Sequence, residues 1–289
     1  MKYLIAENMK IIECPRDAMQ GFVHFIETPV KIKYLNLLLQ AGFDTLDFGS
    51  FVSPKAIPQL RDTEEVLASL DLSATKTKLL AIVANVKGAE MAVKHKEIRY
   101  LGFPFSISET FQQRNTNSSI ADSLVTVARI QELCKQHGKE LVIYISMGFG
   151  NPYGDEWNAE IASHWTSKMV DMEVKIISLS DTIGIANKES IAYMFSNMIQ
   201  AFPQVEFGAH LHTQPHNWQE KIDAAYKNGC RRYDGAIKGF GGCPMAADEL
   251  TGNMPTENII AYMEQAGEQL PLNTVVFNEA MAMSSQVFI

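Results

Sequence analysis

Apolar residues follow two alternating patterns along the chain. Short aliphatic runs, typical of parallel strands covered on both faces, alternate with longer stretches whose apolar positions recur every three or four residues, as on one face of a helix. The runs that predict strands lie at residues 10–13, 45–48, 78–83, 98–103, 141–146, 174–179, 205–212 and 232–237. The clearest helical stretches lie at residues 28–41, 63–70, 120–134, 157–169, 190–198, 218–227 and 257–264.

Eight strands with intervening helices predict an α/β fold with a parallel sheet. Eight such units in 289 residues fit a (β/α)8 TIM barrel, for which ~250 residues are typical. An open doubly wound sheet has the same alternation and stays the alternative. Its dinucleotide-binding form needs G-x-G-x-x-G after the first strand, where this chain has Cys-Pro-Arg-Asp-Ala at 14–18. We predict a single barrel domain over residues 8–270 and a C-terminal tail at 271–289, with the active site at the C-terminal ends of the strands.

The amino-acid composition limits the kinds of partner that the chain is expected to bind. The chain is 46% hydrophobic and has 25 basic against 33 acidic residues, a net charge of −8. This balance argues against nucleic acid or an anionic membrane as partner, because both favour Lys- and Arg-rich surfaces. We find no secretory signal pattern and no apolar run of ~18 residues, so we expect a cytoplasmic protein. The four cysteines form no C-x-x-C pair and are expected to be reduced thiols.

The most informative chemical feature is His210-Leu211-His212 at the end of the seventh predicted strand. Residues i and i+2 of a strand point the same way, so the two imidazoles can converge on one metal ion. Asp17 follows the first strand, which neighbours the eighth when a barrel closes, and Asn253 lies in the loop after the eighth strand. Two nitrogens with hard oxygens favour Mg²⁺ or Mn²⁺ and leave Zn²⁺ or Fe²⁺ as alternatives.

Other polar residues lie at the same predicted edge of the barrel. Arg16 is a candidate cation for an oxyanion beside the metal. Asp47, at the end of the second strand, is a candidate acid or base, or a cap for the strand end. Cys243 lies in the glycine-rich segment 239–244, where glycines permit positive φ, and is a candidate proton donor or acceptor. Ser178 and Asp181 are candidates for orienting the site by hydrogen bonds.

At these residues the chain resembles the DRE-TIM metallolyases, in particular the 3-hydroxy-3-methylglutaryl-CoA lyases. The matching segments are Pro15-Arg16-Asp17 with Gln20, residues 28–31, 50–55, 85–88 and 178–184, His210 with His212, and residues 241–244 with 252–253. They occur in family order over most of the chain.

The resemblance implies a barrel that holds a divalent metal through Asp17, His210, His212 and Asn253. It implies retro-Claisen cleavage of a 3-hydroxyacyl-CoA, with Arg16 stabilising negative charge and Cys243 protonating the acetyl-CoA enolate. The candidate substrate-binding or supporting residues are Gln20, Ser178, Asp181, Asn85 and Lys87. We also expect a homo-oligomer, because barrels of this type commonly associate.

The chain departs from the lyase pattern near the site. The acidic residue that the lyases carry four positions before the arginine falls on Ile12, and the neighbouring Glu13 would point to the other face of its strand. Asp47 stands where the lyases usually carry Glu, and Thr213 replaces an acid after the metal histidines. Two alternatives therefore stay open. One is a Claisen-type acyltransferase or aldolase acting on a keto acid, and the other is a catalytically silent barrel.

Overall fold

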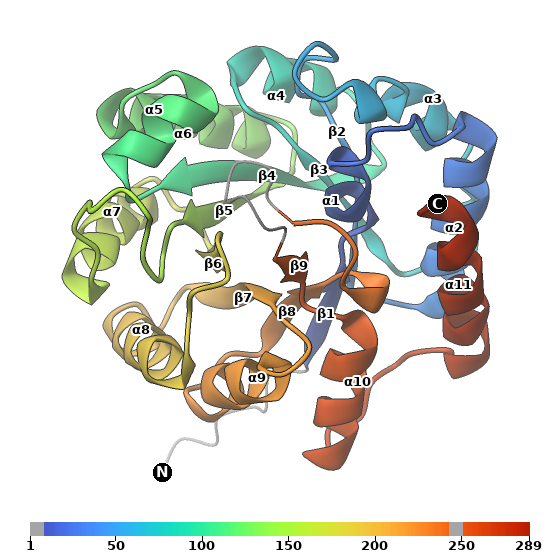
Figure 1. Ribbon diagram of the computed structural model, residues 1–289. Coiled ribbons are helices and arrows are strands. Elements are labelled where there is room, and N and C mark those ends of the chain that lie inside the picture. Colours follow the sequence, from blue (N-terminus) through green and yellow to red (C-terminus); the bar gives the residue numbers. More distant parts are fainter. Residues whose placement is uncertain (1–8, 243–250) are drawn as a thin grey trace.

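Eight parallel strands form a closed barrel in the computed structural model, which describes residues 9–242 and 251–289 (Figure 1). Neighbouring strands pair in chain order, and the pairing of β6 with β7 and of β8 with β1 closes the barrel. The strands are β1 (Lys10–Glu13), β2 (Thr45–Ser50), β3 (Lys78–Ile82), β4 (Ile98–Ser106), β5 (Glu140–Ser146), β6 (Ile176–Asp181), β7 (Glu206–Thr213) and β8 (Arg232–Gly235). The predicted TIM barrel is confirmed, and the open sheet is excluded.

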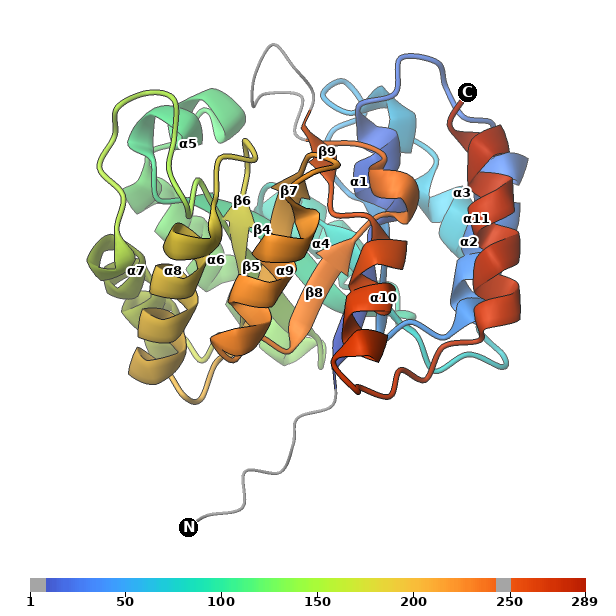
Figure 2. The same cartoon turned by 60° about the horizontal axis from the view of Figure 1, so that its bottom comes forward.

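Helices surround the barrel, as the periodicity of the sequence predicts (Figures 1 and 2). The predicted helices correspond to α2 (Thr28–Ala41), α3 (Thr63–Ala68), α6 (Ile120–Gln136), α7 (Ala159–Asp171), α8 (Lys188–Ala201), α9 (Trp218–Lys227) and α10 (Thr256–Gln265). The sequence pattern did not indicate α1 (Pro15–Gln20), α4 (Val86–Ala92), α5 (Glu109–Thr116) or the two-residue strand β9 (Gly252–Asn253). The run at 232–237 is a shorter strand than predicted, because residues 237–239 form a 3-10 turn.

The predicted tail beyond residue 270 contains helix α11 (Thr274–Val287), which lies along α2 (Figure 2). Its Phe277 ring meets Phe43 edge-on, with 6.0 Å between ring centroids. The Asn273 N–H donates to the carbonyl of Ala41 at 2.9 Å, so the start of α11 is joined to the end of α2. Burial of these aromatic rings stabilises the docked helix.

Two apolar layers hold the barrel together. The larger lies between strands and helices, and the smaller fills the barrel interior with Leu80, Ile82, Tyr100, Val142, Tyr144 and Ile176. Within the part of the chain that the structure describes, no helix has the length and apolar character needed to cross a membrane.

Glu13 points out of the barrel, toward the helix layer, as the alternation along β1 predicts. Its carboxyl group is fully buried and accepts hydrogen bonds from the Ile237 N–H at 3.0 Å and the Thr256 hydroxyl at 2.5 Å. Burial raises the pKa of Glu13 to about 8, because these neutral donors compensate only part of the cost of a buried charge. Glu13 therefore does not replace the acid that the lyases carry at the position of Ile12.

We predict that Glu13→Gln changes how the stability of the protein depends on pH. Because the folded-state pKa of Glu13 is raised, the contribution of its protonated form to the stability of the fold is complete below a pH of about 4.5. This contribution is lost as the pH rises through about 8. The free energy of unfolding of the unaltered protein should then fall by up to ~1.4 kcal/mol per pH unit across this range, whereas the neutral Gln lacks this loss. Urea denaturation between pH 5 and 9 measures it. Glu90→Gln, at an exposed position of α4, is the control, and parallel curves for Glu13→Gln and the unaltered protein would contradict the prediction.

Candidate metal centre and active site

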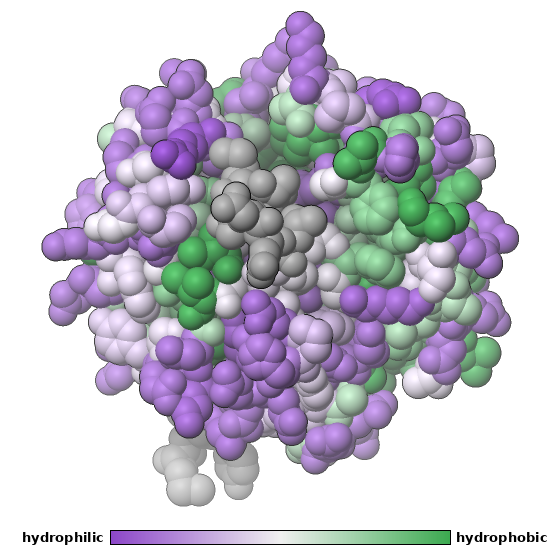
Figure 3. All heavy atoms as spheres, in the orientation of Figure 1, coloured by the Kyte–Doolittle hydropathy of each residue, from purple (hydrophilic) through white to green (hydrophobic). Residues whose placement is uncertain are grey.

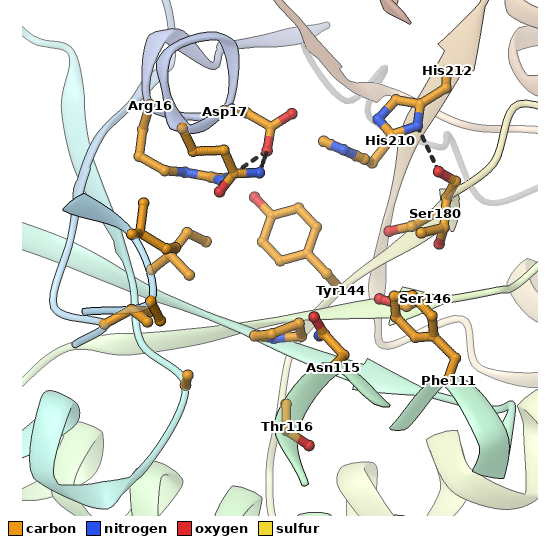
Figure 4. A pocket seen from close by; sticks show the side chains of 18 residues that line it. Arg16, Asp17, Phe111, Asn115, Thr116, Tyr144, Ser146, Ser180, His210 and His212 are labelled. Carbon is orange, nitrogen blue, oxygen red and sulfur yellow. Dashed lines mark hydrogen bonds and ion pairs between the residues drawn. The ribbon is translucent and has the colours of Figure 1, made fainter. Parts of the chain in front are cut away.

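A cavity of about 360 Å³ opens at the C-terminal end of the barrel (Figure 4). One part of its wall is apolar and consists of Val52, Ala56, Ile57, Ile82, Ala84, Pro104 and Phe111. The polar part consists of Arg16, Asp17, Gln20, Asn115, Thr116, Tyr144, Ser146, Ser180, Thr182, His210 and His212. This is the end of the barrel at which the sequence predicts the chemistry.

Asp17, His210 and His212 converge on one side of this cavity. Each offers one ligand atom, and these three atoms lie within 4.8 Å of one another. The histidines occupy alternate positions of β7, and Asp17 reaches them from α1, which begins directly after β1. The separation is suitable for a single divalent ion that binds all three groups.

Hydrogen bonds at Nδ1 orient both imidazoles. Nδ1 of His212 lies 2.9 Å from the carbonyl oxygen of Thr182, which can only accept, so this nitrogen carries the proton. Nε2 of His212 is left as a buried lone pair without a partner among the described residues. Nδ1 of His210 lies 3.1 Å from Oδ2 of Asp234, which directs its Nε2 in the same way. Metal-binding histidines typically have this arrangement, with the second ring nitrogen bonded to a carbonyl or carboxylate.

The surroundings of the two histidines shift their pKa values in opposite directions. Burial alone would lower the pKa of His210, but the hydrogen bond and charge of Asp234 raise it above its ordinary value. Burial and the neighbouring His210 lower the pKa of His212. His212 is therefore held in the neutral form that a metal ligand requires.

The carboxylate of Asp17 is buried yet surrounded by donors. Oδ1 accepts from Arg16 Nη1 at 2.7 Å and from Gln20 Nε2 at 2.9 Å, and Oδ2 accepts from Asn253 Nδ2 at 2.8 Å. Burial would raise its pKa, but Arg16 and the two histidines lower it to about 2. Asn253 reaches Asp17 because β9 pairs antiparallel with the end of β7, opposite His212. All four predicted metal ligands are thus neighbours.

Arg16 lies between Asp17 and Asp47. Its Nε and Nη2 lie 2.9 and 2.5 Å from Oδ2 of Asp47, which is fully buried in β2. Burial raises the pKa of Asp47 to about 6 in spite of this cation. Burial lowers the pKa of Arg16, but the carboxylates of Asp47 and Asp17 raise it by more, so the guanidinium stays charged. Asp47 lies behind Arg16 and holds it, and it does not line the cavity.

Of the other predicted site residues that the structure describes, only some lie at the cavity. Gln20 lines the cavity, whereas Ser178 is fully buried in β6 and does not. Asp181 points toward α9, where its Oδ2 accepts from Lys221 Nζ at 2.7 Å. Asn85 accepts from the Gly88 N–H as the cap of α4, and Lys87 is exposed. Neither Asn85 nor Lys87 lines the cavity, and Cys243 lies outside the described residues.

Two functional candidates, Tyr144 and Asp234, were not found from the sequence, and the structure also identifies which serine of the 178–182 segment reaches the cavity. Tyr144 projects its hydroxyl into the cavity, where this buried oxygen has no partner among the residues described (Figure 4). Ser180, rather than Ser178, presents an unpartnered hydroxyl to the cavity. Asp234 is the register partner of His210 across β7 and β8. The i+2 spacing from Tyr144 to Ser146 at the end of β5 is the signal that could have identified the tyrosine.

The glycine-rich segment after β8 has the positive φ angles that the sequence predicts. Gly239, Gly241 and Gly242 have φ of +67°, +86° and +147°. A Cβ atom on Gly241 would lie 2.7 Å from the carbonyl oxygen of Asp17, so this segment passes directly against α1.

A closed (β/α)8 barrel with a carboxylate and two histidines at the C-terminal ends of its strands has the architecture of the metal-dependent TIM-barrel enzymes. Within that class, the HMGL-like family model matches residues 8–285, and the chain belongs to this family. This finding confirms the resemblance seen in the sequence.

Individual relatives support the family over almost the whole chain. The mitochondrial hydroxymethylglutaryl-CoA lyase of Bos taurus is 31% identical over 283 residues, covering 97% of this chain and 86% of its own. The crystal structure of an HMG-CoA lyase from Brucella melitensis has a TM-score of 0.90 at 26% identity, covering 98% and 99% of the two chains. An HMG-CoA lyase from A. baumannii, solved in complex with coenzyme A and 3-methylmalate, has a TM-score of 0.89 at 27% identity, covering 97% and 91%.

We predict that Asp234→Asn weakens binding of Mn²⁺ by ~10–100-fold, the usual cost of losing the partner of a metal-binding histidine. The amide removes the negative charge beside His210 and can donate to Nδ1, which would move the ring proton to Nε2, the ligand atom. Calorimetric titration of the metal-free protein with Mn²⁺ measures the effect. Asp171→Asn, at an exposed position of α7, is the control. Unchanged Mn²⁺ affinity in folded Asp234→Asn would contradict this role.

Proposed function

We propose that this chain is a divalent-metal-dependent carbon–carbon lyase that cleaves 3-hydroxy-3-methylglutaryl-CoA or a related 3-hydroxyacyl-CoA. The main observation in support is the convergence of Asp17, His210 and His212 beside Arg16, in a chain of the HMGL-like family. Relatives of this chain bear the name hydroxymethylglutaryl-CoA lyase, and one solved relative contains coenzyme A and 3-methylmalate. For 3-hydroxy-3-methylglutaryl-CoA the products are acetyl-CoA and acetoacetate.

Asp17, His210, His212 and Asn253 would hold the metal. The chemistry of these groups fits a divalent ion, because Asp17 is ionised, His212 is neutral and Nε2 of His212 is a buried lone pair without a described partner. Nitrogen and oxygen donors favour Mg²⁺ or Mn²⁺, with Zn²⁺ as the alternative. When bound, the ion would supply Lewis acidity that polarises substrate oxygens and lowers the pKa of the C3 hydroxyl.

The proposed cleavage breaks the bond between C2 and C3. The C3 hydroxyl gives its proton to solvent water and becomes the ketone of acetoacetate, while the bonding electron pair passes to C2 and the thioester oxygen as an enolate. Arg16 is a fixed cation at the cavity wall, and its pairing with Asp47 holds it in place before substrate binds. Such a preorganised charge stabilises the developing oxyanion without reorientation. The enolate then takes a proton at C2 to give acetyl-CoA, and Cys243 is the proposed donor.

We expect the purified protein, supplied with Mg²⁺ or Mn²⁺, to release acetoacetate from 3-hydroxy-3-methylglutaryl-CoA. His210→Ala should abolish most activity with loss of metal, and Arg16→Met should lower kcat by at least ~100-fold, the usual effect of losing an oxyanion partner. Cys243→Ala should lower kcat by ~10²–10⁴-fold if the thiol is the general acid. Coupled assay of acetoacetate measures these effects, and Cys134→Ala, on the buried face of α6, is the control for loss of a thiol.

The same assay separates the alternatives. Activity that His210→Ala or Cys243→Ala leaves intact would contradict the proposed mechanism. Turnover of α-keto acids in place of the CoA ester would favour the condensing or aldolase reaction. Absence of both turnover and bound metal would favour a silent barrel. Homo-oligomerisation and a cytoplasmic location stay predictions.

We predict that Tyr144→Phe lowers kcat/KM by ~10–100-fold, the range for loss of a hydrogen bond to a charged group such as a substrate carboxylate or a developing oxyanion. Burial raises the pKa of Tyr144 well above its ordinary value, so the phenol is a neutral donor facing the cavity. Its hydroxyl has no described protein partner, so the thermal stability of Tyr144→Phe should be unchanged or higher. Steady-state kinetics and thermal denaturation test both expectations. Tyr100→Phe, in the same interior layer but not in the cavity wall, is the control, and an equal loss in that variant would contradict a substrate contact.

A further inference from the structure

The last aromatic residue of the chain contacts the segment 239–242, which lies against Asp17 and Asn253. Phe288 follows α11 and stacks on Phe240, with ring centroids 4.5 Å apart and an interplanar angle of 27°. The other neighbours of its ring are Phe22, at 5.4 Å, and Tyr34, at 6.0 Å. The C-terminus therefore lies at the same end of the barrel as the cavity, beside α1 and α2 (Figures 1 and 2).

Phe240 is joined to the proposed metal ligands through its main chain. Nδ2 of Asn253 donates one hydrogen to the carbonyl of Phe240, at 2.9 Å, and the other to Oδ2 of Asp17, at 2.8 Å. The orientation of the Asn253 amide is thus set jointly by Phe240 and Asp17. A shift of the Phe240 carbonyl would rotate the side-chain amide of Asn253, which donates to both this carbonyl and Asp17.

The segment 239–242 needs an anchor, because its sequence is Gly-Phe-Gly-Gly. Glycines at positive φ have little conformational preference of their own. The segment nevertheless lies tightly against α1, since a Cβ on Gly241 would come within 2.7 Å of Asp17 O and Ala18 Cα. Phe240 is the only one of these four residues whose side chain can hold the segment by packing.

We infer that Phe288 is a positioning residue for the metal centre: it holds Phe240, and through the carbonyl of Phe240 it orients Asn253 against Asp17. The inference rests on the metal centre of the proposed function. A second contact supports the same connection, because Lys238 Nζ, directly before the segment, donates to Ser285 Oγ of α11. The C-terminal end of α11, at Ser285 and Phe288, therefore acts on the active site although it adds no group to the cavity wall.

Apolar residues gather at this end of the molecule, beside the cavity (Figure 3). Among the exposed apolar residues of the described chain, Val23 and Ile289 are 93% and 86% exposed, whereas Phe288 is only 8% exposed. Burial thus distinguishes Phe288 from its neighbour Ile289, which supplies a matched control at the adjacent position.

The test measures Mn²⁺ affinity by electron paramagnetic resonance of the free ion, so it does not depend on turnover. We expect Phe288→Ala to weaken Mn²⁺ binding ~10-fold, the lower end of the range for loss of an outer partner of a metal site. Phe288→Tyr should bind Mn²⁺ like the unaltered chain, because it keeps the stack. Phe288→Leu keeps an apolar group over Phe22 and Tyr34, so it should stay folded and still lose affinity.

Two controls separate the stack from general damage to the helix. Ile289→Ala should leave Mn²⁺ affinity unchanged, and so should Phe277→Leu, which loosens α11 against Phe43 at a distance from Phe240. In a double-mutant cycle, Phe240→Ala combined with Phe288→Ala should bind Mn²⁺ no more weakly than the worse single variant, because both remove one contact.

The outcomes also separate this inference from the proposed function. Unchanged Mn²⁺ affinity in folded Phe288→Ala and Phe288→Leu would overturn the inference alone, while lyase activity of the unaltered protein would stand. Equal loss in Phe277→Leu, or additive losses in the cycle, would also overturn it. Failure of the unaltered chain to bind Mn²⁺, Mg²⁺ or Zn²⁺ in calorimetric titration would overturn both the metal centre and the inference.

Discussion

The active site depends on one buried carboxylate, that of Asp17. An ionised carboxylate in a protein interior is costly unless charges and hydrogen-bond donors surround it. Arg16 and Gln20 supply these from the same short helix, and Asn253 supplies them from β9, far along the chain. The barrel must close before β9 can lie beside α1, so the charge of Asp17 is compatible with burial only in the complete fold. The same arrangement brings both histidines close to Asp17, because β9 pairs with β7, the strand that carries them.

Local periodicity explains how much could be predicted. The eight strands and seven of the helices follow from apolar patterns that are visible within a few residues, and the convergence of His210 and His212 follows from alternation along one strand. The partners of the histidines could not be found in this way. Asp234 meets His210 because β7 and β8 pair in a particular register, and Thr182 meets His212 through a carbonyl that any residue would carry. Register between strands is a tertiary property that the pattern of a single strand does not contain.

The short helix α1 and the terminal helix α11 were missed for different reasons. Residues 15–20 have no apolar period, and they are helical and buried because Arg16 and Asp17 find partners on other elements. Helix α11 has an apolar face, but nothing in its own sequence indicates that Phe277 packs on Phe43 or that Phe288 reaches Phe240. The active-site candidates Asp47 and Asp181 were identified as polar strand ends. The structure shows that they pair with Arg16 and Lys221. Asp181 lies on the side of β6 away from the cavity, whereas Asp47 points into the barrel interior, in register with Leu80, and is not part of the cavity wall.

Three buried acids lie near the first two strands, and their pKa values differ according to the charges around them, above all that of Arg16. Asp17 faces Arg16, two imidazoles and an amide, and its pKa falls to about 2. Asp47 shares the same arginine without the other groups, and burial raises its pKa to about 6. Glu13 has only a hydroxyl and a peptide N–H, and its pKa rises to about 8. The order follows the positive charge around each carboxylate, since burial acts on all three in the same direction. Only Asp17 is firmly anionic and also open to the cavity, so it alone of the three can serve as a metal ligand at neutral pH.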